Sequence, residues 1–283
     1  MLSYGIMQGR LTPSKGRGIQ FFPFDNWKEE FYNAKRLGLD EIEWIFDDDR
    51  HEDNPLWTID GIKALKGVID ESGIKVRSVC FDYFMRKPFY KENLEQQDSV
   101  REKNLDVTKV VLEAMKDIGA SLLEIPMVDN SSIKNKEEGK RAIEFLCDVI
   151  AIATTMNIKI GCETDMPVGT FRQFLENVNH NNIYANYDSG NSSGLGYNHE
   201  EEIMSLGSYI ANVHIKDRKY QGTTMRLGTG SADFDKVFSS LKKIGYSNSI
   251  ILQAARGEDG KEFDEISSQM MFVRDYCKKY DME

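Results

Sequence analysis

The segment "NLDVTKVVLEAMKDIGASLLEIP" (104–126) contains the pattern on which the fold assignment rests. Its first part places apolar side chains three and four positions apart, as at Val111 and Met115, which marks one buried face of a helix. Gly119 follows, and glycine readily takes the left-handed conformation that closes a helix. The short apolar run "SLLEIP" (121–126) then predicts a buried strand. The segment therefore reads as a helix, a glycine and a strand.

The same repeat recurs along the whole chain. Short apolar runs predict eight strands, at 3–7, 41–46, 75–81, 121–126, 159–163, 183–187, 210–215 and 249–253. Amphipathic segments between them predict helices, for example at 27–38, 104–119, 141–156 and 234–245. Continuously apolar strands are typical of a parallel sheet covered by helices. Eight such units in 283 residues predict an α/β fold, a single (β/α)8 TIM barrel spanning 1–283. An open doubly wound sheet is the alternative.

Three long segments that each follow a predicted strand, at 9–25, 82–103 and 217–230, are expected to be loops over the mouth of the barrel. Active sites of such barrels lie at the carboxyl ends of the strands. Polar residues recur there, namely Gln8, Arg10, Glu43, Asp82, Glu124, Glu163, Asp188, Asn191, His214, Asp217 and Gln253. We expect these side chains to point into one mouth, where unpaired buried charges would be costly without a metal or a substrate.

Composition and charge argue against several classes of protein, namely nucleic-acid-binding, secreted and membrane-spanning proteins. The formal net charge is −10 with acidic residues spread along the chain, which argues against a nucleic-acid surface. The N-terminal "MLSYGIMQGRL" does not resemble a signal peptide, and no apolar run approaches the ~20 residues of a membrane span. We therefore expect a cytoplasmic protein, for which a monomer and a homo-oligomer are both open alternatives. The cysteines lack CxxC spacing and are expected to be buried thiols, at positions Cys80, Cys147, Cys162 and Cys277.

Glu163, Asp188 and His214 close three successive predicted strands. Two carboxylates and an imidazole are ligand types for a divalent ion such as Mn²⁺, Mg²⁺, Co²⁺ or Zn²⁺, so we expect one such ion at this rim. A lone histidine at the end of a strand is more often a hydrogen-bonded core residue, and the two preceding carboxylates are what favour a ligand. The other histidines are expected to be exposed, namely His51, His180 and His199.

The loop "KDRKYQGTTMRLGTGSADF" (216–234) combines glycines with cations. Its backbone N–H groups, together with Lys216, Arg218 and Arg226, are suited to a phosphate or an array of sugar hydroxyls. The alternative is a solvated loop followed by a helix that Ser231 or Asp233 caps.

Several motifs together make the chain recognisable. "CETD" (162–165), "NYDSGN" (186–191), "VHIKDR" (213–218), "RLGTGSADF" (226–234) and "SIILQ" (249–253) resemble the xylose-isomerase-like TIM-barrel superfamily. That superfamily holds sugar and sugar-phosphate isomerases and epimerases, and the endonuclease IV branch. The resemblance covers essentially the whole chain, since "YGIMQGRL" (4–11) and "LGLDEIEW" (37–44) look like the family's first two strands.

The resemblance implies a ligand set. Sugar epimerases of the family hold one metal with Glu, Asp, His and Glu from the fifth to the eighth strands, and the two Glu act as paired acid and base. Glu163, Asp188 and His214 match the first three positions, whereas Gln253 stands where the family usually has Glu. Glutamine can coordinate through its carbonyl oxygen but cannot exchange a proton near neutral pH. Other carboxylates are candidates for the missing acid or base, namely Glu43, Glu124, Asp165 and Asp217.

The expected function is a divalent-metal-dependent isomerase or epimerase of a sugar, sugar phosphate or related polyol ketone. Glu163 would abstract a proton to form a metal-stabilised enediolate. The residues expected to bind substrate are Gln8, Glu43, Glu124, Asn191, Lys216, Asp217, Arg218 and Arg226. One alternative is a degenerate barrel that binds a sugar without turnover, which Gln253 favours. Another is an endonuclease IV-like nuclease, which the four histidines and the acidic charge disfavour.

Overall fold

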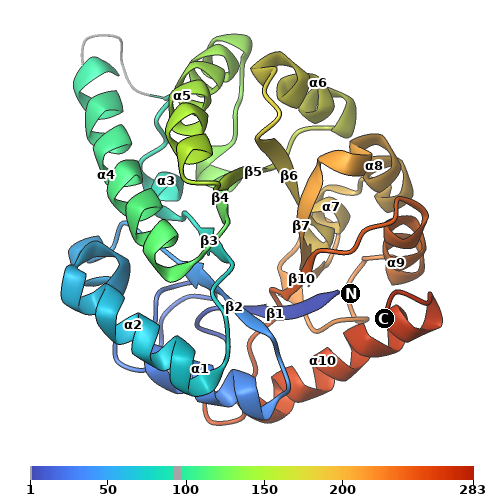
Figure 1. Cartoon of the computed structure of the whole chain (residues 1–283). Helices are drawn as coiled ribbons and strands as arrows, with labels where there is room; N and C mark the ends of the chain where they lie inside the picture. The colour runs from blue at the N-terminus through green and yellow to red at the C-terminus, as the bar shows by residue number, and fades with distance from the viewer. Residues whose placement is uncertain (1, 92–96) are drawn as a thin grey trace. The chain divides into compact units, whose positions relative to one another are not determined.

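The computed structural model describes residues 2–91 and 97–283. Eight parallel strands close a barrel in the order β1-β10-β7-β6-β5-β4-β3-β2, with helices between them in the sequence, which confirms the predicted (β/α)8 barrel (Figure 1). All eight predicted strands are present. They are β1 (Ser3–Met7), β2 (Glu41–Ile45), β3 (Ser78–Cys80), β4 (Leu122–Met127), β5 (Lys159–Thr164), β6 (Ile183–Asp188), β7 (Ile210–Ile215) and β10 (Ser249–Leu252).

The four helices predicted above are also confirmed. The α-helices are α1 (Trp27–Arg36), α2 (Ile59–Ser72), α3 (Tyr83–Arg86), α4 (Gln97–Ile118), α5 (Lys136–Thr155), α6 (Val168–Val178), α7 (Ser189–Leu195), α8 (His199–Leu206), α9 (Phe234–Lys243) and α10 (Glu262–Lys279). Two predicted loops contain regular structure. The segment 82–103 holds α3 and the start of α4, with 92–96 outside the described residues. The segment 217–230 holds an antiparallel pair, β8 (Asp217–Arg218) and β9 (Thr224–Met225).

Contacts along the chain group it into two compact units. Unit 1 comprises Met1–Trp44, Val68–Lys75 and Ala185–Glu283, and unit 2 comprises Ile45–Gly67 and Val76–Tyr184. In unit 1, β1 pairs with β2 and β10, β10 pairs with β7, and β7 pairs with β6. In unit 2, β4 pairs with β3 and β5. All these pairings are parallel, so the carboxyl ends of the strands in each unit share one edge.

Unit 1 fixes the start of its first long loop through a buried acid. Glu30 of α1 accepts hydrogen bonds from the backbone N–H groups of Gly9 (2.6 Å) and Leu11 (3.1 Å), and from Thr12 Oγ1 (2.9 Å). Burial raises the pKa of this carboxyl. These hydrogen bonds therefore anchor the loop that follows β1 to α1, a helix of the same unit.

Unit 2 packs α4, α5 and α6 side by side outside its strands (Figure 1). The apolar stripe of α5 supplies Phe145, whose ring stacks on Phe89 with centroids 4.1 Å apart. Asn135 caps α5 by accepting from the N–H of Glu138. These contacts set the helix layer outside β4 and β5.

The four cysteines are free thiols, as expected, but they are not all buried. Cys80, Cys162 and Cys277 are buried, whereas Cys147 is exposed on α5. Its position in an amphipathic helix faces away from the apolar stripe, so the prediction was wrong at this residue. Across residues 2–91 and 97–283, no helix has the length and apolar character needed to cross a membrane.

Candidate functional site

His214 lies near the end of β7 in a fully buried polar network of unit 1. Its Nε2 donates to Glu43 Oε1 at 2.6 Å, and Asn212 Nδ2 donates to Glu43 Oε2 at 2.8 Å. His214 Nδ1 faces Asn186 Nδ2 at 3.1 Å. Because a carboxylate only accepts, Nε2 carries the proton and Nδ1 keeps the lone pair that a metal ion needs.

Strand register explains this cluster. On β7, Asn212 and His214 are two residues apart and so share one face of the strand. The Cα partner of His214 on β6 is Asp188, and Asn186 is the partner of Asn212. Glu43, which we expected to contact substrate, accepts a hydrogen bond from His214. A carboxylate that accepts from the second nitrogen of a histidine is a recurrent feature of metal-ligating histidines.

Asp188 ends β6 and caps α7. Its Oδ1 accepts from the N–H groups of Gly190 (2.7 Å) and Asn191 (2.8 Å). Its Oδ2 lies 3.4 Å from Lys216 Nζ. The turn chemistry that makes "NYDSGN" look like an ordinary loop is therefore real, yet it leaves one carboxylate oxygen directed at another polar group.

Lys216 and Gln253 lie together beside Asp188. Lys216 Nζ donates to Gln253 Oε1 at 3.1 Å and to Asn191 Oδ1 at 3.4 Å. Gln253 Nε2 in turn donates to Gln20 Oε1 at 2.9 Å. Gln20 was not predicted, since it lies in the middle of the long loop after β1 and no pattern in the sequence marks it.

Arg218 joins the same group through Asn191. Its Nη1 donates to Asn191 Oδ1 at 3.1 Å, and its Nη2 donates to the carbonyl of Gly222 at 3.0 Å. Gln8 is fully buried at the end of β1, where its N–H donates to the carbonyl of Glu43 at 3.0 Å. Unit 1 thus brings together six of the predicted residues, namely Glu43, Asp188, Asn191, His214, Lys216 and Gln253, with Arg218 beside them.

Asp217 anchors the glycine loop. Its fully buried carboxylate accepts from the N–H groups of Gly228 (3.0 Å), Gly230 (2.8 Å) and Ala232 (3.0 Å). These N–H groups are therefore directed at Asp217 and do not form the phosphate cradle that we considered. The helix cap that the alternative expected is confirmed at Asp233, which caps α9.

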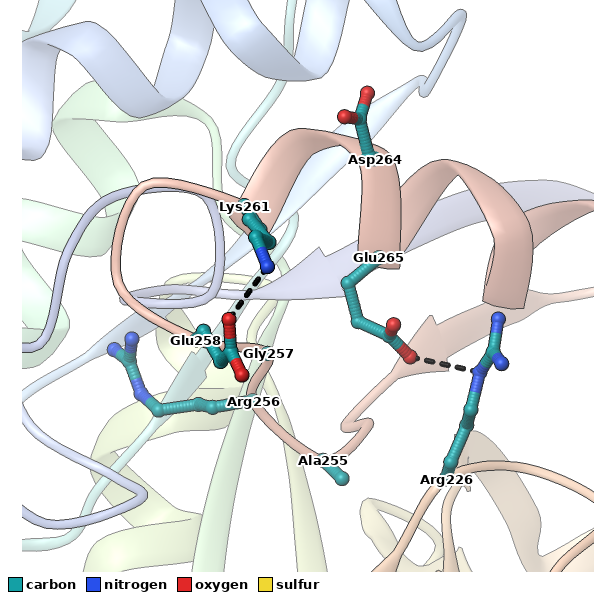
Figure 2. A pocket seen from close by; sticks show the side chains of 8 residues that line it. All are labelled: Arg226, Ala255, Arg256, Gly257, Glu258, Lys261, Asp264 and Glu265. Carbon is teal, nitrogen blue, oxygen red and sulfur yellow. Dashed lines mark hydrogen bonds and ion pairs between the residues drawn. The ribbon is translucent and has the colours of Figure 1, made fainter.

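Arg226 lies apart from this cluster, in a pocket of about 770 Å³ (Figure 2). Its Nε pairs with Glu265 Oε1 at 2.9 Å, and Lys261 Nζ pairs with Glu258 Oε2 at 2.6 Å. The pocket is lined by Arg226, Ala255, Arg256, Gly257, Glu258, Lys261, Asp264 and Glu265. With as many acidic as basic residues, the pocket is not a cationic cradle for an anion.

Four of the predicted residues belong to unit 2, namely Asp82, Glu124, Glu163 and Asp165. Glu163 lies near the end of β5 and is 5% exposed, and Glu124 is fully buried on β4. Asp165, just beyond β5, accepts from Ser132 Oγ and lies 3.8 Å from Lys134 Nζ. Asp165 therefore has structural partners. Glu163 has the strand-end position that we expected of a catalytic or ligating carboxylate.

The remaining histidines differ from one another. His180 is exposed, as predicted. The prediction was wrong for His51, which is partly buried against the rings of Trp57 and Tyr83. It was also wrong for His199, which is buried with its Nδ1 2.7 Å from Tyr187 Oη. A histidine in a polar run such as "YNHEEE" gives no signal of burial when its partners come from other elements.

His199 belongs to a buried network that also contains Glu202. Ser192 Oγ lies 2.9 Å from His199 Nδ1 and donates to Glu202 Oε2. Burial lowers the pKa of His199 to about 4 and raises the pKa of Glu202 to about 7. The network joins α7 to α8 and so supports the helix that Asp188 caps.

Comparison with known proteins finds sugar epimerases among the relatives of this chain. L-ribulose-5-phosphate 3-epimerase UlaE from Escherichia coli (strain SMS-3-5 / SECEC) is 25% identical over 242 residues, covering 80% of this chain and 81% of the relative. The enzyme of that name from Shigella sonnei (strain Ss046) is 25% identical over 267 residues, covering 89% of each chain. These relatives are sugar epimerases.

Solved structures share the fold. D-allulose 3-epimerase from Methylomonas sp. has a TM-score of 0.75 at 16% identity and covers 97% of this chain and 98% of its own. The IOLI protein with a binding zinc atom has a TM-score of 0.76 at 20% identity and covers 98% of this chain and 99% of its own. The family model for the xylose isomerase-like TIM barrel matches residues 31–276. The chain therefore belongs to the xylose isomerase-like TIM-barrel family.

Proposed function

We propose that the protein is a divalent-metal-dependent epimerase that acts on the carbon beside the carbonyl of a ketose or ketose phosphate. One observation carries the proposal. Three consecutive strands, β5, β6 and β7, each end at or near a buried side chain of a type that ligates metal ions. These side chains are Glu163, Asp188 and His214. The relatives named L-ribulose-5-phosphate 3-epimerase support the substrate class.

The donor set fits a divalent ion. Two carboxylates and one neutral imidazole suit Mn²⁺, Mg²⁺, Co²⁺ or Zn²⁺. His214 is held in the tautomer whose Nδ1 can ligate, since Glu43 fixes Nε2–H. A metal at Nδ1 would replace the hydrogen bond from Asn186. When bound, the ion would polarise the substrate carbonyl and the neighbouring hydroxyl.

The chain's own residues would carry the proton transfer. Glu163 would take the proton from the carbon beside the carbonyl, and negative charge would develop on the carbonyl oxygen. Lys216 and Arg218 would stabilise that charge or contact hydroxyls or a phosphate, with Asn191 beside them. From unit 2, Glu124 would contact substrate hydroxyls; from unit 1, Gln8 would do the same.

In this scheme no side chain is assigned to return the proton on the opposite face of the substrate carbon. Gln253 cannot deliver a proton, and Glu43, Asp165 and Asp217 have the structural partners described above. We therefore propose that water returns the proton, that the proton released by Glu163 neutralises the hydroxide left behind, and that this step limits turnover. If it is too slow to sustain catalysis, the protein is a sugar-binding barrel, which is the second candidate and rests on the amide at position 253.

The test is epimerisation by metal-stripped protein before and after addition of Mn²⁺, Mg²⁺, Co²⁺ or Zn²⁺. Ketopentoses and ketohexoses would be offered with and without a phosphate, and products separated by chromatography. The proposal expects product only in the presence of a metal. Full activity in excess chelator would refute metal dependence, and saturable sugar binding without product would favour the second candidate.

A further inference from the structure

The path of the Lys216 side chain is shaped by the short helix α7. A Cβ atom at Gly190 would collide with the Lys216 side chain, and one at Gly194 would lie 3.1 Å from Arg218 Nε. The glycines of "SGNSSG" (189–194) therefore let both cationic side chains lie directly against the helix. This packing carries the Lys216 ammonium to the end of β6, next to Asp188.

The ammonium uses the one atom of Gln253 that could ligate a metal. Hard divalent cations bind the carbonyl oxygen of an amide and not its nitrogen. In this chain Gln253 Oε1 accepts from Lys216 Nζ, while Nε2 donates to Gln20 Oε1. These two hydrogen bonds fix the orientation of the amide, with its oxygen toward the ammonium.

The charge around Lys216 and Asp188 also differs from the charge that a glutamate at position 253 would give. Asp188 Oδ1 accepts two backbone N–H groups, so its Oδ2 is shared between Lys216 and any bound metal. A glutamate at position 253 would neutralise Lys216. The amide holds the ammonium without adding a second negative charge, so Lys216 is paired with the charge of Asp188 alone.

We propose that Gln253 is a positioning residue for Lys216 and not a fourth metal ligand. The proposed ligands are then Glu163, Asp188 and His214, and the Lys216 ammonium is fixed beside Asp188. This inference rests on the proposed metal dependence. It assigns to Gln253, which follows the eighth barrel strand β10, a role different from the metal ligation that the family resemblance implies.

The test is calorimetric titration of the metal-stripped full chain with MnCl₂ in the absence of substrate. Gln253→Met and Lys216→Met remove the amide oxygen and the ammonium at similar side-chain volume, and Asp188→Asn serves as the ligand control. Circular dichroism and thermal melting establish that each variant is folded. We expect Gln253→Met to change the Kd for Mn²⁺ by less than about threefold. Lys216→Met should tighten binding about tenfold, because a cation is removed next to Asp188.

The outcomes separate the two proposals. A tenfold or greater loss of affinity in Gln253→Met, with no tightening in Lys216→Met, would overturn the positioning role and leave metal dependence intact. An affinity that changes less than about threefold in Gln253→Met, together with tightening in Lys216→Met, supports the positioning role, since loss of a ligand would weaken binding. No binding of Mn²⁺ by any of the proteins would overturn the metal dependence itself. Unchanged binding in Asp188→Asn would refute the ligand set.

Discussion

Glu43 offers the sharpest test of the network around His214. Its two carboxylate oxygens accept from His214 Nε2 and Asn212 Nδ2, and all these side chains are buried. Glu43→Gln keeps the shape but removes the charge. Glu43→Leu removes both acceptors. The two variants therefore separate the charge of this side chain from its hydrogen bonds.

The structure sets the expected magnitudes. Loss of an outer partner of a metal-ligating histidine costs about 10- to 100-fold in metal affinity. In Glu43→Leu, two buried donors lose their acceptors at about 1–3 kcal/mol each, so we expect a loss of stability of about 2–6 kcal/mol. In Glu43→Gln the loss is smaller, about 1 kcal/mol, because Asn212 Oδ1 has no hydrogen-bond partner among the described residues and can accept from the new amide.

The assay is Mn²⁺ titration combined with urea unfolding. Glu30→Gln is the matched control, since Glu30 is a similarly buried carboxylate that accepts hydrogen bonds from the loop after β1. Weaker Mn²⁺ binding in Glu43→Gln, with the control unchanged, is the expected result. Equal affinity in wild type and Glu43→Leu, with both folded, would show that Glu43 does not act on a metal-binding histidine.

Three further predictions concern other parts of unit 1. The raised pKa of Glu202, about 7 against an ordinary 4.5, makes its stabilising contribution complete below pH 4.5 and lost as the pH rises through 7. Urea unfolding of Glu202→Gln should therefore show less loss of stability between pH 5 and 8 than wild type, by about 1–3 kcal/mol at pH 8. Asp217→Ala should cost about 2–4 kcal/mol and speed amide hydrogen exchange at 228–232, because three N–H groups lose their acceptor. Gln253→Glu should raise the epimerisation rate about tenfold or more if return of the proton is limiting, and unchanged turnover would show that it is not.

Much of the fold could be predicted because it depends on local patterns. The αβ repeat around Gly119 and the eight apolar runs are short-range signals, and the structure places a strand at each run. The hairpin of β8 and β9 was not predicted, because each strand is only two residues long and has no periodicity. The burial of His199 was missed for a different reason, since its partner Tyr187 lies on another element.

The candidate site shows where sequence patterns reach their limit. The strand-end rule placed Asp188, His214 and Gln253 at one edge, because parallel register is fixed by the fold. The rule could not distinguish polar residues that stabilise the fold from those that belong to the candidate site. Lys216 and Asp217 follow His214 by two and three positions, yet the Asp217 carboxylate anchors a loop whereas the Lys216 ammonium joins the cluster. Side-chain direction and hydrogen-bond partners decide such roles, and they depend on residues distant in sequence.

The most direct test of the proposed function is exchange of the substrate C–H proton with deuterated water. Metal-loaded protein would be incubated with ketoses and ketose phosphates in D₂O, and deuterium at the carbon beside the carbonyl followed by NMR. This signal reports proton abstraction even when no product accumulates. We expect exchange that requires the metal and falls by about 100-fold or more in Glu163→Gln. Full exchange in a folded, metal-binding Glu163→Gln would contradict the assignment of Glu163 as the base.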